Sequence, residues 1–466
     1  MSAHVKESEN RKQFEKTLSN IYANEVPLYS KTLPIVEEMN EKARRERGLE
    51  NEKQPVQEHH GAIRVGTAEE LKNMSRLFRV MGMEPVNYYD LSVANLPVHS
   101  TAFRATTKEG LEENGFRVFC SLLREDLLPK DLQPKVKETL EKRQIISDKA
   151  MEMIEAYEEQ GGLTEEQSKI FIEESAKTFQ WNEKATVSKE FYEELLETNS
   201  LVADIVSFST PHINHLTPKT ENIDALFLRF HEEGIETTPV IQGPPPRENP
   251  ILLRQMAFKA LEAKSLFPDG KDGYEEGKHR ARFGEYETKE DMAVTPKGRE
   301  LYDELLNKVR SKTSENDPNY MNILQQEFKA FPDTKEELRE KGLAYFRYSV
   351  NEEALGQQGS KSINSWEDAI KKGVIEYDKV PYHDFLPVSA AGIFKSNLME
   401  GGFVKAQKKN NSQEEFEKAL GRKVIDSFEL YEAQEKESIE KVSSKLGIEP
   451  SKHVKNAQEK KTFMCL

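Results

Sequence analysis

The run His59-His-Gly-Ala-Ile-Arg-Val-Gly-Thr67 is the stretch that decides the fold. Its first seven residues predict a short β-strand. Thr67 and Glu70 have the spacing of a capping box, which predicts that a helix begins directly after this strand. Apolar residues then recur at helical spacing, and Gly82 is suited to end the helix.

Three further strand candidates follow this helix, at residues 85–91, 101–106 and 116–122. The predicted order is therefore strand, helix, strand, strand, strand. This order defines a βαβββ unit that covers residues 55–129.

A second unit of the same order is predicted from residue 204 onward, without obvious sequence repetition. Its segment 252–267 is ambiguous, because its composition favours a helix whereas the parallel with the first unit favours a strand. The other expected elements are a strand at Asp204–Ser209 that leads into Pro211–Pro218, a helix at 220–233, and strands at 237–241 and 279–288. We therefore expect an α+β fold in which two βαβββ units form a cupped mixed sheet.

Charged amphipathic helices are predicted around these two units. We expect all segments together to form one compact catalytic body. The expected segments are a helical N-terminal segment at 1–54, the first unit at 55–129, a helical insertion at 130–203, the second unit at 204–300, additional strands with a substrate-site segment at 301–411, and a helical C-terminal tail at 412–466.

The composition disfavours several kinds of partner and location. The chain has 67 Lys and Arg against 82 Asp and Glu, a net charge of −15, which disfavours nucleic acid and anionic membranes as partners. Two widely separated cysteines, Cys120 and Cys465, give no disulfide framework, so a reducing compartment is expected. The first ten residues lack the apolar core of a secretory signal, and no run approaches the ~18 apolar residues of a membrane span. We expect a soluble cytoplasmic protein.

Two histidines and a glutamate, in three separate strand-like segments, form a candidate metal site. His60 lies on the first strand of the first unit, His215 on or just beyond the first strand of the second, and Glu285 on the last strand of the second. Side chains from three strands can converge only inside the cup, so the sheet is expected to surround the metal. Two imidazoles and a carboxylate on one face of a divalent ion leave the opposite face open for substrate and dioxygen, as in mononuclear non-haem iron sites.

Each histidine has a competitor nearby in the sequence. His59 competes with His60, although strand alternation places neighbouring residues on opposite faces. His212 competes with His215 more seriously, because both lie in the same short segment. The Asn-His-Leu-Thr-Pro context favours His215.

The carboxylate also has a competitor. Glu287 is two residues beyond Glu285 and therefore shares its face of the strand. Periodicity alone cannot separate the two.

Arg64 shares the strand face of His60, roughly 13 Å further along the strand. Burying a charged guanidinium inside the cup of the sheet costs free energy unless it pairs with an anion. Two interpretations remain open from the residues: a salt bridge to one of the 82 acidic residues, or a bidentate clamp on a substrate carboxylate.

Six motifs together resemble a known family over about residues 55–435. They are His60-Gly-Ala-Ile-Arg64, His99-Ser-Thr-Ala-Phe-Arg104, Phe116-Arg-Val-Phe-Cys-Ser-Leu-Leu-Arg124, Asn214-His-Leu-Thr-Pro218, Phe283-Gly-Glu285 with Thr295-Pro-Lys-Gly298 nearby, and Phe385-Leu-Pro-Val-Ser-Ala-Ala-Gly-Ile-Phe394. The chain resembles the 2-oxoadipate dioxygenase/decarboxylase family, also called hydroxyglutarate synthase. This family has a fold of the vicinal-oxygen-chelate type and is distantly similar to 4-hydroxyphenylpyruvate dioxygenase.

The resemblance implies roles for individual residues. In the Phe-x-Glu motif that the resemblance rests on, the glutamate two residues after Phe283 is Glu285, which favours Glu285 over Glu287 as the metal ligand. One departure is the strand end, where the usual Glu-x-Glu-Gln-Arg-Gly is replaced by Glu285-Tyr-Glu-Thr-Lys-Glu-Asp291. The implied residues are the iron ligands His60, His215 and Glu285, a specificity arginine at Arg64, and substrate contacts at Val388 and Ser389.

The resemblance also implies an activity. The expected cofactor is Fe(II), and the expected reaction converts 2-oxoadipate and O₂ into 2-hydroxyglutarate and CO₂ in lysine catabolism, with no catalytic residue beyond the metal site. Two alternatives stay open: a metal-dependent isomerase or lyase on the same scaffold that uses no O₂, and a non-catalytic binding protein.

Overall fold

The computed structural model describes residues 4–49, 56–289, 291–358, 363–386 and 412–450. The chain forms two compact bodies. The larger body contains residues 1–242, 255–288 and 385–425, and the smaller body contains residues 243–254, 289–384 and 426–466. These bodies cut across the segment borders expected from the sequence, and each is described by itself.

The first βαβββ unit is confirmed in the larger body. The predicted capping box is present: the Thr67 side chain accepts a hydrogen bond from the Glu70 backbone N–H, and the Glu70 carboxylate accepts one from the Thr67 N–H. Gly82 follows the helix with φ +63°, in the left-handed region. The elements are β1 (Glu58–Val65), α3 (Ala68–Arg79), β2 (Glu84–Asp90), β3 (Val98–Arg104) and β4 (Arg117–Leu123), with a short α4 (Lys108–Glu113) before β4.

The second unit follows the predicted order with two corrections. The strand predicted at Asp204–Ser209 is wrong, because residues up to Ser207 form a helix whose first turn is capped by the Asn199 side chain. Residues 201–207 are all buried, and a segment buried on every side does not show the periodicity that separates helix from strand. The elements are α9 (Ser200–Ser207), β5 (His215–Thr220), α10 (Ile223–Glu232), β6 (Gln255–Ala257), β7 (Leu261–Pro268) and β8 (Tyr274–Thr288).

The strand predicted at 237–241 is also wrong. Only Thr237 pairs there, through an isolated bridge to Phe258. Pro239 lies in the middle of the predicted strand and has no N–H to donate to a ladder. The ambiguous segment 252–267 forms strands rather than a helix, because β6 and β7 both pair with β8.

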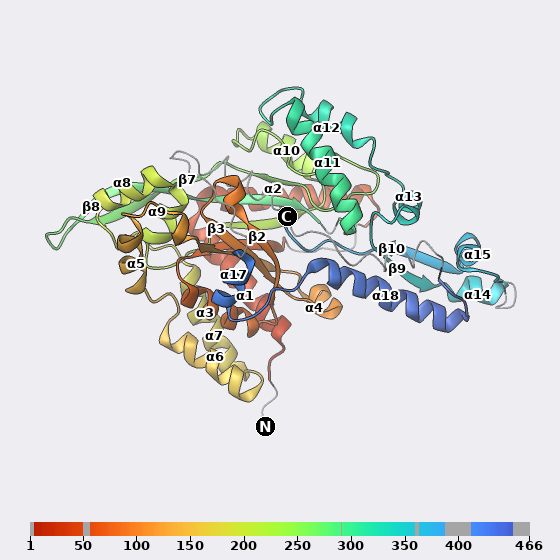
Figure 1. Cartoon of the computed structure of the whole chain (residues 1–466), viewed down its shortest axis with the longest axis horizontal. Coiled ribbons are helices and arrows are strands. Elements are labelled where there is room, and N and C mark those ends of the chain that lie inside the picture. Colours follow the sequence, from red (N-terminus) through yellow and green to blue (C-terminus); the bar gives the residue numbers. More distant parts are fainter. Residues whose placement is uncertain (1–3, 50–55, 290, 359–362, 387–411, 451–466) are drawn as a thin grey trace. The chain divides into compact units, whose positions relative to one another are not determined.

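The sheet follows one path, β2-β3-β4-β1-β5-β8-β6, with β7 paired to β8. Figure 1 shows β2 beside β3, and β7 with β8 in the long hairpin. In each unit the first strand pairs in parallel with the last: β1 with β4, and β5 with β8. The two first strands, β1 and β5, pair antiparallel at the centre. The three strands expected to carry the metal ligands, β1, β5 and β8, are therefore neighbours.

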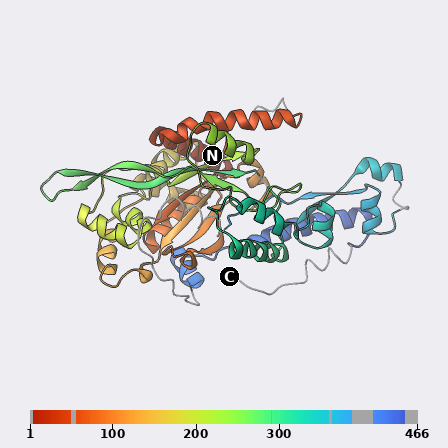
Figure 2. The ribbon, with the colours of Figure 1, turned by 90° about the horizontal axis from the view of Figure 1, so that it is seen from above.

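Helices cover both faces of this sheet. The N-terminal helices α1 (Glu7–Glu25) and α2 (Pro27–Glu46) lie along one side of it (Figure 2), where Phe14 and Tyr22 share a core with Ile63 and Val65. The opposite face packs through Ala62 and Phe119 against helices of the insertion. The insertion contains α5 (Gln133–Glu141), α6 (Asp148–Gln160), α7 (Glu165–Ala176), α8 (Lys189–Thr198) and α9, and α17 (Ser412–Leu420) completes the larger body.

The smaller body joins a two-stranded sheet to helices. Its elements are α11 (Pro296–Lys312), α12 (Tyr320–Phe328), α13 (Lys335–Glu340), β9 (Phe346–Val350), α14 (Glu352–Gln358), α15 (Trp366–Lys371), β10 (Ile375–Lys379) and α18 (Ser427–Leu446). β9 and β10 pair antiparallel. Of the helices in the described ranges, none has both the length and the hydrophobicity needed to cross a lipid bilayer.

One buried carboxyl joins α18 to this small sheet. Glu435 is 6% exposed, and its Oε1 accepts a hydrogen bond of 2.8 Å from the Phe346 backbone N–H. Burial raises the pKa of Glu435 to about 7, because the charged form loses its hydration. The folded protein therefore holds a proton here that the unfolded chain releases near its ordinary pKa of 4.5.

Glu435→Gln is expected to remove part of the pH dependence of stability. Between pH 4.5 and about 7 the folded state binds more protons at this site, so stability falls as pH rises through this range. The neutral amide avoids this loss and keeps an acceptor for the Phe346 N–H. The free energy of unfolding at pH 8 should rise by about 3 kcal/mol relative to the wild type, with little change at pH 4.5. Denaturant unfolding at both pH values measures this, and the exposed Glu440→Gln on the same helix is the control. Parallel pH curves for Glu435→Gln and the wild type would contradict the assignment.

Candidate metal centre

The structure brings together the donor atoms of His60, His215 and Glu285. The two Nε2 atoms are 3.3 Å apart, and the Glu285 oxygens lie 3.3 Å from His60 Nε2 and 3.5 Å from His215 Nε2. All three donors are within 4.8 Å of one another, and all three residues are buried. Bonds of about 2.0–2.2 Å to one ion place neighbouring donors about 3.0–3.5 Å apart, so the cluster can hold a divalent metal.

Strand register explains why these three side chains meet. His60 on β1 lies opposite Thr217 on β5, and His215 lies opposite Ala62. His215 also lies beside Phe283 on β8, two residues before Glu285. Each ligand therefore lies one diagonal step from the next on adjacent strands, within reach of a common point. The Thr217 hydroxyl, 3.1 Å from His60 Nε2, lies beside that point.

Glu287 holds the other nitrogen of His60. Its Oε2 lies 3.3 Å from His60 Nδ1, and its Oε1 accepts a hydrogen bond of 2.8 Å from Arg117. A carboxylate at Nδ1 keeps the proton there and leaves the Nε2 lone pair for a metal. Burial alone would raise the pKa of Glu287, but Arg117 and the nearby histidines hold it well below its ordinary value. The geometry thus separates the two glutamates: Glu285 points to both Nε2 atoms, and Glu287 supports His60 from behind.

Gln255 links the two carboxylates. Its amide nitrogen donates to Glu285 Oε1 at 2.6 Å and to Glu287 Oε2 at 3.2 Å. It lies on β6, which pairs with the strand that carries both glutamates. These bonds restrict the orientation of Glu285 before any metal binds.

His215 is kept in the form that binds metals. Burial, with the neighbouring His60, holds the pKa of His215 well below its ordinary value, so its imidazole is neutral. Its ring stacks on Phe283 with the ring centroids 4.8 Å apart. Both effects favour a fixed, uncharged ligand.

The competing histidines lie elsewhere. A register shift between Glu58 and His60 locally breaks strand alternation, so His59 also contacts Glu287 through its Nδ1. The expectation that His59 faces away from His60 is therefore wrong at this bulge, but His59 does not join the three donors. Within the described part of the chain, His60, His215 and Glu285 are the only group of three or more such side chains whose ligand atoms all lie within 4.8 Å of one another. His212 instead lies with its Nε2 3.1 Å from Asp204 Oδ1.

Arg64 has a protein partner. Its Nη1 lies 2.5 Å from Asp204 Oδ2, and both side chains are buried. The salt bridge that the sequence left open is therefore present. A role for Arg64 in substrate binding stays a proposal, and the two predicted contact residues, Val388 and Ser389, lie outside the described residues.

Phe385 covers one side of the metal centre, which sequence reasoning missed. Its ring meets the His60 ring edge-on at 4.7 Å and the Phe119 ring at 5.0 Å, and Arg117 lies over it at 4.4 Å. Phe385 begins one of the six motifs, so its motif was a signal, whereas nothing in the local sequence marks Gln255. The aromatic cover limits the access of water to His60.

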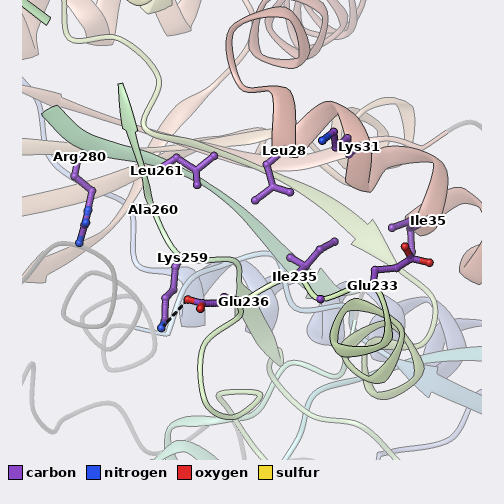
Figure 3. Close-up of a pocket in the computed structure, with 11 residues that line it drawn as sticks. Leu28, Lys31, Ile35, Glu233, Ile235, Glu236, Lys259, Ala260, Leu261 and Arg280 are labelled. Carbon is purple, nitrogen blue, oxygen red and sulfur yellow. Dashed lines mark ion pairs between the residues drawn. The ribbon is translucent and has the colours of Figure 1, made fainter. Parts of the chain in front are cut away.

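A separate surface groove has different chemistry (Figure 3). Lys259 and Glu236 form an ion pair of 2.9 Å there. No histidine or cysteine is among the described residues that line it, which are Leu28, Lys31, Ile35, Glu233, Gly234, Ile235, Glu236, Lys259, Ala260, Leu261 and Arg280. This groove is therefore not part of the metal centre.

A curled mixed sheet is built from two βαβββ units, and two imidazoles and one carboxylate converge on it in an arrangement that could hold one metal ion. The profile of the 2-oxoadipate dioxygenase/decarboxylase family matches residues 14–397. The chain therefore belongs to this family, and the resemblance seen in its motifs is confirmed.

Individual relatives cover nearly the whole chain. A Pseudomonas putida protein named 2-oxoadipate dioxygenase/decarboxylase is 44% identical over 456 residues, which cover 94% of this chain and 97% of the relative. The Escherichia coli protein of the same name is 43% identical, with 94% and 98% covered. The crystal structure of the P. putida hydroxyglutarate synthase in complex with 2-oxoadipate matches with a TM-score of 0.84 at 42% identity, over 96% of this chain and 100% of that one.

Glu287→Gln is expected to weaken metal binding by about 10-fold or more, because the carboxylate behind a histidine ligand raises the basicity of that ligand. Competition of Co²⁺ between the protein and a coloured chelator measures the affinity. The control is Glu70→Gln, which changes another buried carboxylate paired with an arginine, Arg143, at 2.7 Å. Equal Co²⁺ affinities for Glu287→Gln and the wild type would show that Glu287 does not strengthen His60 as a metal ligand.

Proposed function

We propose that this chain is an Fe(II)-dependent dioxygenase/decarboxylase that converts 2-oxoadipate and O₂ into 2-hydroxyglutarate and CO₂. The observation that supports it most is the convergence of His60, His215 and Glu285 on one point. The names of the P. putida and E. coli relatives and the 2-oxoadipate in the P. putida crystal structure support the choice of substrate. The reaction balances in atoms without any further reductant.

Ferrous iron fits the donor set. His60 and His215 would supply two imidazole nitrogens and Glu285 a carboxylate oxygen to the ion, and a 2-oxo acid and dioxygen would bind at its remaining positions. When bound, the iron supplies Lewis acidity toward the 2-oxo acid and the redox chemistry that activates dioxygen.

The chain itself supplies orientation and shielding. Glu287 Oε2 lies 3.3 Å from His60 Nδ1 and would favour the proton on that nitrogen when Nε2 binds the metal. Phe385 and Phe119 exclude water from one side of the centre.

At the far end of the substrate, Arg64 would hold the distal carboxylate and fix the reach of the carbon chain. Val388 and Ser389 are proposed as further substrate contacts. A cytoplasmic location and a place in lysine catabolism stay predictions from the sequence and its resemblance.

Oxygen consumption by the iron-loaded protein tests this function. Adding 2-oxoadipate to Fe(II)-reconstituted protein should start O₂ uptake with an equal amount of CO₂ released, because each turnover consumes one O₂ and loses one carboxyl group. His60→Ala should abolish both and lose iron, since two protein ligands remain. Conversion of 2-oxoadipate without O₂ uptake would instead indicate an isomerase or lyase, and binding without turnover would indicate a binding protein.

A further inference from the structure

A second buried cluster surrounds the carboxylate of Asp204 on α9. Asp204 Oδ1 lies 2.9 Å from His279 Nε2 and 3.1 Å from His212 Nε2. Asp204 Oδ2 lies 2.5 Å from Arg64 Nη1 and 3.3 Å from Asn214 Nδ2. All five residues are buried, with exposed fractions of 0–4%. The carboxylate comes from α9, at the border of the helical insertion and the second unit, whereas its partners come from β1, β8 and the segment before β5.

Three hydrogen bonds hold the carboxylate: one from His279 to Oδ1, and one each from Arg64 and Asn214 to Oδ2. His212 Nε2 lies close to Oδ1 as well. These contacts restrict the rotation of the group. Burial alone would raise the pKa of Asp204, but His212 and Arg64 hold it well below its ordinary value. Asp204 is thus a fixed anion.

Aromatic and hydroxyl groups fix the two imidazoles in turn. The Tyr192 hydroxyl lies 2.9 Å from His279 Nδ1. Because an ionised carboxylate only accepts hydrogen bonds, His279 Nε2 donates its proton to Asp204 Oδ1. Trp181 lies parallel to the His279 ring at 5.9 Å and meets the His212 ring edge-on at 4.8 Å. His212 has φ +30°, a backbone conformation that side-chain-bearing residues rarely adopt, and its contact with Asp204 helps to offset this strain.

The cluster has the residue types of a metal site but not its electrostatics. A cation beside Asp204 would meet the guanidinium of Arg64, which bonds to the same carboxylate. His212, His279 and Asp204 also do not meet the donor-distance criterion that the metal centre meets among the described residues. The arrangement is suited to hold an arginine rather than a metal.

Two contacts of Asp204, with Arg64 and with Asn214, connect it through the chain to residues of the candidate metal centre. Arg64 lies four residues after His60 on β1 and shares its face of the strand. Asn214 directly precedes His215, and its backbone is held at both ends: its N–H donates to Ala62 O, and its carbonyl accepts from the Tyr22 hydroxyl, each at 2.9 Å. A single carboxylate therefore connects the proposed clamp with the start of the strand that carries a metal ligand.

We propose that Asp204 is the positioning residue for Arg64: it holds the guanidinium in the orientation that binds the distal carboxylate, and so makes the site selective for dicarboxylic over monocarboxylic 2-oxo acids. This inference rests on the proposed function. A guanidinium has five N–H donors, so a bond to Asp204 is compatible with a bidentate contact to a substrate. An arginine that is already ordered loses little side-chain entropy on binding, which increases affinity. Helix α9 would then serve to place this carboxylate beside the sheet.

Asp204→Asn tests the proposal with two substrates of equal chain length, 2-oxoadipate and 2-oxohexanoate, of which only the first has a distal carboxylate. A misplaced guanidinium should lower kcat/KM for 2-oxoadipate roughly 10- to 100-fold, mostly through KM, and leave 2-oxohexanoate unchanged. The double variant Arg64→Ala/Asp204→Asn should lose no more than Arg64→Ala alone, because Asp204 acts through Arg64. Glu70→Gln should leave both substrates unaffected.

Each contrary result has a distinct meaning. Equal losses on both substrates, or additive losses in the double variant, would overturn the positioning role and leave a structural one. If Asp204→Asn does not fold, His279→Gln removes one imidazole contact to Asp204 while keeping the Asp204–Arg64 pair. It should reduce the selectivity in the same direction, and unchanged selectivity there would also overturn the proposal. A different observation would refute the proposed function itself: the wild-type protein would consume no O₂ with 2-oxoadipate.

Discussion

The antiparallel pairing of β1 with β5 is the interaction on which the rest of the structure depends. It joins the two βαβββ units at their first strands and places His60 and His215 on neighbouring strands in a fixed register. The parallel pairing of β5 with β8 then brings Glu285 alongside. A slip of one residue in either pairing would move a ligand to the opposite face of the sheet. The metal centre is thus a direct product of strand register.

The buried carboxylates near these paired strands each have close partners. Glu287 pairs with Arg117, and Asp204 pairs with Arg64. The close partners of Glu285 are two imidazoles and the amide of Gln255. Burying a carboxylate is costly unless a positive charge accompanies it. A divalent cation between Glu285 and the imidazoles would supply that charge, which gives a physical reason for a metal at this point.

Much of this arrangement could be predicted from the sequence because its signals are local. The capping box at Thr67, strand-like runs and the turn at Gly82 predicted the first unit correctly. The positions of His60 and Glu285 on first and last strands predicted that these residues could meet.

What the sequence could not provide is information about contacts between distant residues and about fully buried segments. The run Asp204–Ser207 is buried on every side, so its helical form was not visible in its periodicity. The partners of Arg64 and Glu287 lie 140 and 170 residues away in the chain, where no local pattern can reveal them. The bulge that turns His59 toward Glu287 is a similar case, since it exists only in the pairing of two strands.

Anomalous diffraction at the iron edge, from crystals loaded with Fe(II) without oxygen, tests the central claim most directly. The account predicts one strong peak about 2.0–2.2 Å from His60 Nε2, His215 Nε2 and a Glu285 oxygen, the usual range of such metal–ligand bonds. A peak beside Asp204, His212 and His279, or an iron bound without one of the three ligands, would contradict it.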